Sequence, residues 1–285
     1  MSELVVVRPG PLTTVQDLGR RGVAHLGVPR AGALDGPALL AANRLVGNEP
    51  GAAALETTLG GVALRASAAV LIAVTGAPAP VRVAGRPAAW GAPVAVPAGA
   101  VVEVGAATHG VRSYLAVAGG IAVPELFGSR SADLLSGLGP APLAVGTVLP
   151  VGPAHPRPAV ELVPLPAPPG ELVLRLRPGP RADWFTPEAV AGLPRQRYRV
   201  AGASNRIALR TEGPPLPRAR TGELPSEGMV LGAVQVPPDG RPVVFLADHP
   251  TTGGYPVIGV VPAADLAGAA QARPGVPVRF LLLRE

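Results

Sequence analysis

The sequence contains no cysteine and no lysine, and each absence excludes a class of chemistry. Without cysteine this chain has no disulfide, no thiolate metal site and no thiol nucleophile. Without lysine it has no Schiff base, no biotinyl-lysine and no Walker A phosphate loop, because that loop reaches the phosphates through a lysine. The 25 residues counted as lysine plus arginine are therefore all arginines.

Aromatic residues are also scarce, at 3% of the chain, which weighs against nucleic acid as a partner. The formal net charge of +6 would favour a polyanion, but the arginines are spread along the chain. A single cluster, Arg195–Arg199, combines arginines with an aromatic residue. Proteins that bind single-stranded nucleic acid stack the bases on aromatic rings. We therefore interpret the cluster as a solvated strand or loop face and expect no nucleic-acid partner.

Long apolar runs are missing as well. The longest run, Ala68–Val74, is far shorter than the ~18 residues that a membrane-spanning helix needs. The opening residues Met-Ser-Glu lack the basic and apolar regions of a signal peptide. These observations predict a cytoplasmic protein with no membrane partner.

Glycine and proline are abundant, with 37 residues of each, and hydrophobic residues make up 48% of the chain. Both glycine and proline interrupt helices, and they bound apolar runs of strand length. The composition predicts a mostly-β fold with few short helices. At ~150 residues per domain, a length of 285 residues corresponds to about two domains.

The strongest predicted helix spans Asp35–Val46, because Asp35 is a good N-cap and Gly47 a good stop signal. A hairpin is expected over Val81–Pro87. Shorter helices are expected at Ser131–Leu135 as a single turn, from Thr186 onward, and over Ala263–Ala272. The expected strands include Leu4–Val7, Val70–Val74, Val101–Val104, Tyr114–Val117, Leu172–Leu176, Val243–Leu246, Val257–Val261 and Val276–Leu283.

Prolines are dense between residues 150 and 170, which predicts a stiff connection. We therefore expect two β-barrel-like lobes. The N-terminal lobe would cover residues 1–155 and contain the Asp35–Val46 helix, the connection would cover 156–170, and the C-terminal lobe would cover 171–285.

A polar, glycine-rich segment, Asp248–Tyr255, follows one of the expected strands. Its centre, Thr251-Thr252-Gly253-Gly254, could turn several backbone N–H groups toward one anion. Asp248 and His249 could then hold a metal-bound phosphate or move a proton. The alternative is a turn in which the Asp and Thr side chains cap local backbone groups, and the spacing alone favours that alternative.

A second polar segment contains Ser129, Arg130 and Asp133. Arg130 and Asp133 lie on one face if the turn is helical, so they could bind a carboxylate or phosphate. An ion pair that fixes the loop is an equally good interpretation. The four histidines are far apart in sequence, and no histidine metal centre is predicted.

Seven polar or glycine-containing motifs follow one another along nearly the whole chain. They are Gln16-Asp17-Leu18-Gly19-Arg20, Ala31-Gly32-Ala33-Leu34-Asp35, Ala42-Asn43-Arg44-Leu45-Val46-Gly47-Asn48, Gly128-Ser129-Arg130-Ser131, Ser204-Asn205-Arg206, Ser226-Glu227-Gly228 and Thr251-Thr252-Gly253-Gly254-Tyr255-Pro256. In this order they resemble the KipI-antagonist family, which is also called allophanate hydrolase subunit 2 or the biotin-dependent carboxyltransferase family.

The resemblance implies cyclophilin-like β-barrel lobes, a KipI-like partner called the B subunit, and a larger complex with a large A subunit. Three activities occur in the family. They are ATP-dependent opening of 5-oxoproline to glutamate, the carboxyltransferase step of urea carboxylation, and relief of kinase inhibition by KipI. The first fits this chain best, because the chain has no biotin-carrier or biotin-carboxylase segment. ATP and Mg²⁺ are then expected in the complex, with no biotin attached to this chain.

The expected site lies where the Asp248–Tyr255 loop meets the Gly128–Asp133 segment, close to the KipI-like partner. Catalytic roles are expected for four residues, and substrate or phosphate binding for eight. The catalytic candidates are Arg130, Asp133, Asp248 and Tyr255, and the binding candidates are Ser129, Asn205, Arg206, Glu227, Thr251, Thr252, Gly253 and Gly254.

Overall fold

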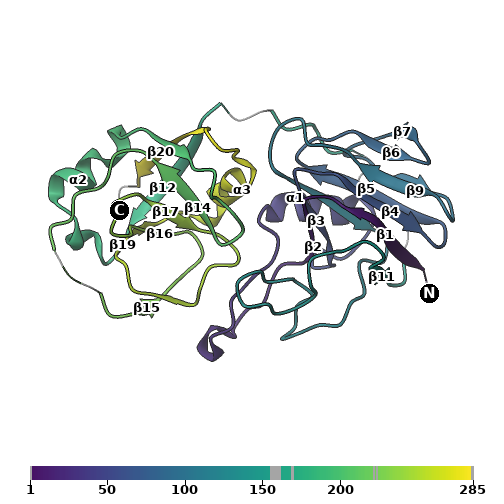
Figure 1. Ribbon diagram of the computed structural model, residues 1–285, viewed down its shortest axis with the longest axis horizontal. Helices are drawn as coiled ribbons and strands as arrows, with labels where there is room; N and C mark the ends of the chain where they lie inside the picture. The colour runs from purple at the N-terminus through teal and green to yellow at the C-terminus, as the bar shows by residue number, and fades with distance from the viewer. Residues whose placement is uncertain (1, 155–161, 168–169, 221, 223, 284–285) are drawn as a thin grey trace. The chain divides into compact units, whose positions relative to one another are not determined.

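The computed structural model describes residues 2–154, 162–167, 170–220, 222 and 224–283. The chain divides into two compact units, drawn in Figure 1, and each is described by itself. Unit 1 comprises Met1–Arg20, Ala31–Asp133 and Gly137–Pro168, and unit 2 comprises Arg21–Arg30, Leu134–Ser136 and Pro169–Glu285. The expected connection falls partly outside the described residues, because of positions 156–170 only 162–167 and 170 are described.

Unit 1 is built from two sheets and one helix. The six-stranded sheet has the order β11-β1-β4-β9-β6-β7, and the five-stranded sheet has the order β2-β3-β10-β5-β8. The elements in chain order are β1 (Glu3–Pro9), β2 (Leu12–Gln16), α1 (Gly36–Leu45), β3 (Ala54–Thr58), β4 (Val62–Ala66), β5 (Val70–Gly76), β6 (Val81–Val83), β7 (Arg86–Ala88), β8 (Val94–Val96), β9 (Val101–Val104), β10 (Arg112–Val117) and β11 (Val148–Pro150).

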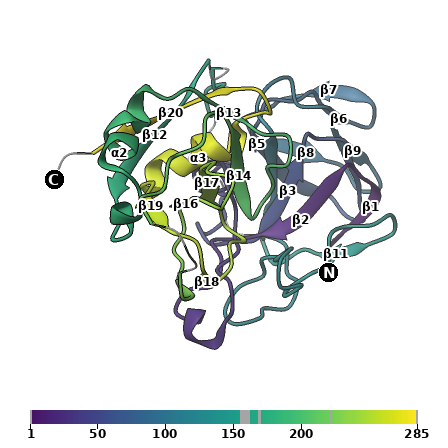
Figure 2. The same cartoon turned by 60° about the vertical axis from the view of Figure 1, so that its left-hand side comes forward.

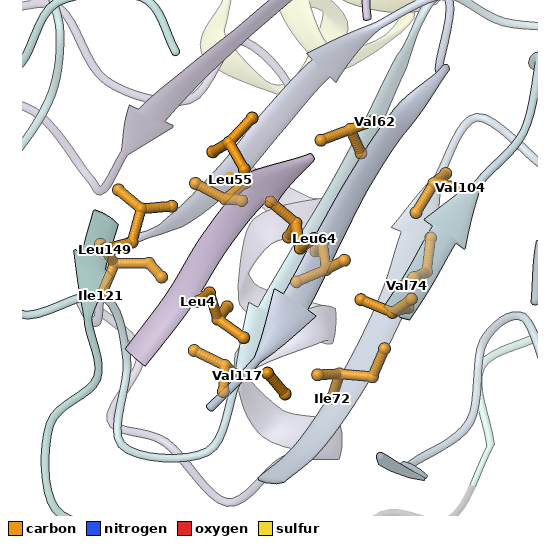
Figure 3. Close-up of a cluster of buried hydrophobic side chains, with 14 of the residues drawn as sticks. Leu4, Leu55, Val62, Leu64, Ile72, Val74, Val104, Val117, Ile121 and Leu149 are labelled. Carbon is orange, nitrogen blue, oxygen red and sulfur yellow. The ribbon is translucent and has the colours of Figure 1, made fainter. Parts of the chain in front are cut away.

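One apolar core fills the space between the two sheets, as Figure 3 shows. The six-stranded sheet contributes Leu4 and Leu64 to it, and the five-stranded sheet contributes Leu55, Ile72 and Val117. Successive side chains of a strand point to opposite faces, so every second residue reaches this core. Unit 1 is therefore a sandwich of two antiparallel sheets.

Helix α1 covers the other face of the five-stranded sheet. Leu39 and Leu45 of the helix pack against small strand residues such as Ala73 and Ala116. The helix begins as predicted, because the Asp35 carboxylate accepts the Ala38 N–H at 3.0 Å. The short alanine side chains let the helix lie close to the sheet.

A buried carboxylate joins the start of α1 to strands β3 and β10. The Tyr114 hydroxyl donates to Oε2 of Glu56 at 2.6 Å and accepts the Asp35 N–H at 2.8 Å. The same Glu56 oxygen accepts the Leu34 N–H at 3.0 Å, and Arg112 lies 3.7 Å from the other carboxylate oxygen. Burial, together with the nearby charge of Glu56, raises the pKa of Tyr114 well above its ordinary value. The phenol therefore stays protonated and acts as a permanent donor.

Unit 2 is a closed barrel with strand order β12-β19-β16-β17-β14-β13-β20, drawn from a second side in Figure 2. Its first and last strands pair in parallel, with Leu172 opposite Val278, whereas its other pairs are antiparallel. The elements are η1 (Ala24–Leu26), β12 (Leu172–Pro178), η2 (Ala182–Trp184), α2 (Pro187–Gly192), η3 (Leu193–Arg195), β13 (Tyr198–Val200), β14 (Ala208–Glu212), β15 (Glu227–Gly228), β16 (Ala233–Gln235), β17 (Val243–Phe245), β18 (Thr252–Gly253), β19 (Val257–Val260), α3 (Ala263–Gln271) and β20 (Pro277–Leu282).

The prediction of a mostly-β fold with few short helices is confirmed, and so is the hairpin. Its turn residues Ala84 and Gly85 have φ values of 49° and 76°, as a tight two-residue hairpin turn requires. The prediction of a helical turn over Ser131–Leu135 is wrong, since the structure has no helix there. The Ser131 hydroxyl instead accepts the backbone N–H of Asp17. None of the described helices is long and apolar enough to span a membrane.

The Tyr114 hydroxyl generates a testable prediction. Tyr114→Phe removes the hydroxyl that accepts the Asp35 N–H and donates to Glu56 inside the protein, so the free energy of unfolding at pH 7 should fall by about 1–3 kcal/mol. Because unfolding lowers the phenol's pKa toward ~10, the wild-type protein should lose stability as pH rises above that value. The variant should lose less over the same pH range.

Urea unfolding measures both effects. Trp184→Phe as background leaves Trp90 as a fluorescent reporter in unit 1. Tyr255→Phe is the matched control, because the Tyr255 side chain is exposed. Equal stabilities of Tyr114→Phe and the control at pH 7 would contradict the assigned role.

Candidate functional site

In unit 1 the predicted polar segment is organised by a buried carboxylate, that of Asp17. Its Oδ1 accepts the hydroxyls of Ser129 and Ser131 at 2.6 and 2.5 Å, and also the Gly19 N–H at 2.8 Å. Its Oδ2 accepts the Arg130 N–H at 2.6 Å. Ser129 therefore orients a carboxylate within the protein.

Arg130 is held by two partners near it in sequence. Its Nε donates to the Val123 carbonyl at 2.8 Å, and its Nη1 lies 2.7 Å from Oε1 of Glu125. About a third of its side chain is exposed, so the guanidinium is fixed while one part still faces solvent. Asp133 is almost fully buried, and its backbone N–H donates to the Leu138 carbonyl at 2.9 Å.

Arg20 is a buried cation that belongs to the first of the seven motifs but was not among the predicted site residues. Its Nη2 donates to the Ser131 carbonyl at 2.5 Å and its Nε to the Leu126 carbonyl at 3.1 Å. Only 2% of the residue is exposed. Because a buried arginine must satisfy its donors within the protein, Arg20 fixes the path of the chain on both sides of Ser129. The motif Asp17-Leu18-Gly19-Arg20 was a signal for this arrangement, but its spacing did not indicate which carbonyls Arg20 contacts.

In unit 2 the central feature is a buried ion pair between Arg206 and Asp248. The guanidinium donates twice, from Nε to Oδ2 at 2.9 Å and from Nη2 to Oδ1 at 2.8 Å. Oδ2 also accepts the Leu134 N–H at 3.2 Å. The two side chains are 2% and 0% exposed. This bidentate geometry is the strongest form of the arginine–carboxylate contact, and it commits both groups to holding the loop that begins at Asp248.

The segment Thr251–Gly254 differs from the anion-binding turn considered above. Thr252 and Gly253 form strand β18, which pairs with Gly228 and Glu227 of β15. The Thr251 carbonyl accepts the Met229 N–H at 2.9 Å. Because a strand is extended, its N–H groups alternate in direction and do not converge on one point. The exposed Thr252 side chain is left as a polar group for a ligand.

The remaining predicted residues of unit 2 lie around this hairpin. Glu227 forms an ion pair with Arg181, and that hydrogen bond holds the pKa of Glu227 below its ordinary value. The side-chain oxygen Oδ1 of Asn205 accepts the N–H groups of Ile207 and Ala208, so this side chain shapes a turn. Tyr255 is 43% exposed, and it is the predicted catalytic residue whose side chain is most accessible to a substrate.

Among the residues that the structure describes, no group of three or more histidines, cysteines, aspartates and glutamates is placed to hold a metal ion. Both oxygens of Asp248 already accept from Arg206. Asp248 is therefore already committed to Arg206, and Mg²⁺ in the complex stays a prediction.

The predicted residues fall into two groups, one in each unit. Ser129, Arg130 and Asp133 belong to unit 1, and the segments around Asn205, Glu227 and Asp248–Tyr255 belong to unit 2. Within unit 2 the structure brings Asp248 to Arg206, and Gly253 to Glu227. The meeting of the two groups at one site stays a prediction.

Solved structures share this architecture. The crystal structure of TTHA0988 matches 99% of this chain with a TM-score of 0.87 and 38% identity, and this chain spans 56% of that one. The crystal structure of the K. lactis urea amidolyase matches 99% with a TM-score of 0.90 and 30% identity, but this chain spans only 19% of it. The chain thus has the fold of a class of mostly-β proteins that also occurs within longer polypeptides.

The family model described as "Carboxyltransferase domain, subdomain A and B" matches residues 26–282, and the chain belongs to this family. The C subunit of 5-oxoprolinase from Escherichia coli (strain K12) is 38% identical over 98% of this chain and 90% of that protein. The Haemophilus influenzae protein of the same name is 34% identical over 94% and 87%. "Urea amidolyase" of Lachancea kluyveri is 34% identical over 97% of this chain, but over only 17% of its own length. The family resemblance drawn from the seven motifs is confirmed.

The buried ion pair leads to a prediction about stability. Arg206→Met removes the cation that compensates the buried Asp248 carboxylate, and it should lower the free energy of unfolding by about 3–5 kcal/mol. The double variant Arg206→Met with Asp248→Leu should regain most of that loss, because the uncompensated charge is gone. Urea unfolding in a Trp90→Phe background measures both, with Trp184 as the reporter in unit 2.

Arg241→Met provides the matched control, because the Arg241–Asp239 pair is half exposed. Its loss should cost less than ~1 kcal/mol. A cost for Arg206→Met that is no larger than the cost for the control would refute the structural role of the buried pair.

Proposed function

We propose that this chain is the C subunit of an ATP-dependent 5-oxoprolinase, which opens the lactam of 5-oxo-L-proline to L-glutamate together with its A and B subunits. The match over nearly the full length of two bacterial proteins of that name carries the proposal. The match to urea amidolyase supports a second candidate, the carboxyltransferase step of a biotin-dependent urea carboxylase. In that case biotin would be attached outside the 285 residues of this sequence, because they contain no lysine to carry it.

Opening a lactam requires activation of the amide carbonyl, because amide resonance makes it a poor electrophile. In the proposed reaction the amide oxygen attacks the terminal phosphorus of ATP and ADP leaves. Water then adds to the activated carbon, the lactam C–N bond breaks and phosphate is released with glutamate. Charge then develops on the phosphoryl and lactam oxygens and must be stabilised by fixed donors. Exposed donors of this kind are the Arg130 guanidinium in unit 1 and the hydroxyls of Thr252 and Tyr255 in unit 2.

The buried members of the predicted site are assigned a different part in the reaction. Asp248 and Arg206 contact each other, and Ser129 contacts Asp17, so we propose that they position the segments that carry the exposed donors. Asn205 and Glu227 have the same role, through a turn and an ion pair. The positioning residues would then affect turnover through geometry, and the exposed donors through direct contact.

We further propose that the KipI-like B subunit binds this chain and that the large A subunit completes the complex. Three exposed valines, Val7, Val145 and Val148, lie along strands β1 and β11 or next to them. A backbone hydrogen bond from the Gly146 N–H to the Val6 carbonyl holds these two segments together. Strand β11 is a sheet edge, and exposed apolar edges favour protein contacts.

Gel filtration of the co-expressed proteins tests the partner. The wild-type chain should elute with the KipI-like protein, whereas Val148→Asp should weaken the complex at least tenfold, because the carboxylate would lose water in an apolar interface. Val230→Asp, at an exposed valine of unit 2, is the matched control and should still co-elute. Separate elution of the wild-type proteins at micromolar concentration would refute the proposed pairing.

Reconstitution tests the activity itself. Glutamate should form from 5-oxoproline only when ATP, this chain and the A and B subunits are all present. Full activity without this chain would overturn the proposal. Carboxylation of urea by a carboxybiotin carrier, with no glutamate formed, would favour the carboxyltransferase candidate instead.

Tyr255 is the sharpest single-residue test in that assay. Tyr255→Ala should lower turnover about a hundredfold if the phenol contacts the transition state, and the melting temperature should stay unchanged because the side chain is exposed. Tyr255→Phe separates the hydroxyl from the ring, and Val230→Ala serves as an exposed control. Thr252→Ala and Arg130→Ala are assayed in the same way. Near-wild-type turnover in all three alanine variants would remove these donors from the site.

A further inference from the structure

The arginine-rich cluster Arg195–Arg199 lines a cavity in unit 2, although its sequence had suggested a solvated face. The cavity has a volume of about 570 Å³ and lies where η3 leads into β13 and where β13 pairs with β20. We call it the arginine pocket and define it by its charged and amide side chains. These are Glu171, Arg195, Gln196, Arg197, Arg199 and Arg279.

The strand pairing explains why the arginines gather on one side. In β13 the Tyr198 side chain is buried in the barrel, whereas Arg197 and Arg199 on either side of it are exposed. Tyr198 lies opposite Val278 of β20, which is also buried, so the neighbouring Arg279 faces outward like Arg199. Alternation along two paired strands therefore places these guanidinium groups on one outer face.

The arginine pocket has more positive than negative charge. Its one carboxylate, Glu171, is used by Arg279, whose Nη2 lies 3.0 Å from Oε2. Arg199 donates to the Gly275 carbonyl at 3.1 Å and lies opposite Glu212 of β14, and among the described residues it forms no ion pair. Arg195 and Arg197 form no ion pair with the residues that the structure describes. The four arginines and one glutamate thus carry a net charge of 4 − 1 = +3.

Some other arginines of unit 2 are paired with nearby aspartates, whereas Arg177, Arg210 and Arg218 form no ion pair with the described residues. Arg175 pairs with Asp265, Arg220 with Asp183, and Arg241 with Asp239. Crowding of like charges on adjacent strand positions lowers stability unless an anion compensates them. The arginine pocket differs in gathering four arginines around one cavity with a single glutamate, so a bound anion would stabilise the protein.

We propose that the arginine pocket binds compounds that carry two or more linked phosphate groups. A guanidinium fork matches phosphate oxygens with two parallel hydrogen bonds, and several forks around one cavity match a chain of phosphates. The volume lies within the ~300–1,000 Å³ that is usual for small-molecule sites. A nucleic-acid strand is disfavoured, because the one aromatic residue of the pocket, Tyr198, is buried. This site does not depend on the proposed function.

Isothermal titration of the full-length chain alone with inorganic tripolyphosphate tests the proposal, and no partner protein is needed. Arg197→Gln and Arg195→Gln should each raise the dissociation constant about tenfold, since each removes a charge-assisted contact. Arg210→Gln is the matched control, because Arg210 is an exposed arginine on β14 outside the pocket. The control should bind as the wild type does, and tripolyphosphate should raise the melting temperature of both.

Further ligands distinguish the sources of the phosphate chain. ATP that binds as tightly as tripolyphosphate shows that the phosphates alone are recognised, and tighter binding of ATP shows that the nucleoside also contributes. Either result supports the site. The proposal is overturned if sulfate binds as tightly as tripolyphosphate, if a single-stranded oligonucleotide binds more tightly, or if the control loses as much affinity as Arg197→Gln. Absence of binding by the wild-type chain at low ionic strength also overturns it.

Discussion

The structure of unit 1 depends on its five-stranded sheet, which is buried on both faces. All six residues of β10 are buried, because the sandwich core covers one of its faces and α1 covers the other. The two faces differ in side-chain size, with Leu115 and Val117 toward the core and Ala116 toward the helix. A larger residue at Ala116 would push α1 away, and Asp35 with it.

Buried carboxylates are the second constraint, and they explain why several conspicuous acidic residues are not free for chemistry. Asp17, Glu56 and Asp248 each accept hydrogen bonds from backbone N–H groups and from side chains far away in sequence. A carboxylate that is buried and satisfied in this way fixes the positions of loops. Its removal would leave several donors unpaired at once, so its effect on catalysis would come through the loops that it positions.

The sequence predicted those features that local chemistry determines. Helix α1 and the Ala84–Gly85 hairpin follow from capping and turn residues that lie within a few positions of one another. The error at Ser131–Leu135 has a long-range cause, because the Ser131 hydroxyl is used by Asp17. The same holds for Thr252 and Gly253, which are extended because they pair with β15.

The residues of the candidate site divide in the same way, into features set by nearby residues and features set by contacts between distant parts of the chain. The motifs identified the segments around Arg130 and Asp248, but the partners Glu125 and Arg206 depend on the folded chain. The cluster Arg195–Arg199 can be recognised in the sequence. The cavity that it lines forms only because β13 pairs with β20. Pairing between distant strands is what the sequence alone did not specify.

The parallel pair of β12 and β20 has a consequence for synthesis. Because β20 lies between β12 and β13, the barrel of unit 2 stays open until this last strand has left the ribosome. Until then β12 and β13 each present a bare edge to other chains, and the nascent barrel is at its most prone to aggregation. The sandwich of unit 1 needs nothing later than β11 for its two sheets, so it can be complete while unit 2 is still being made.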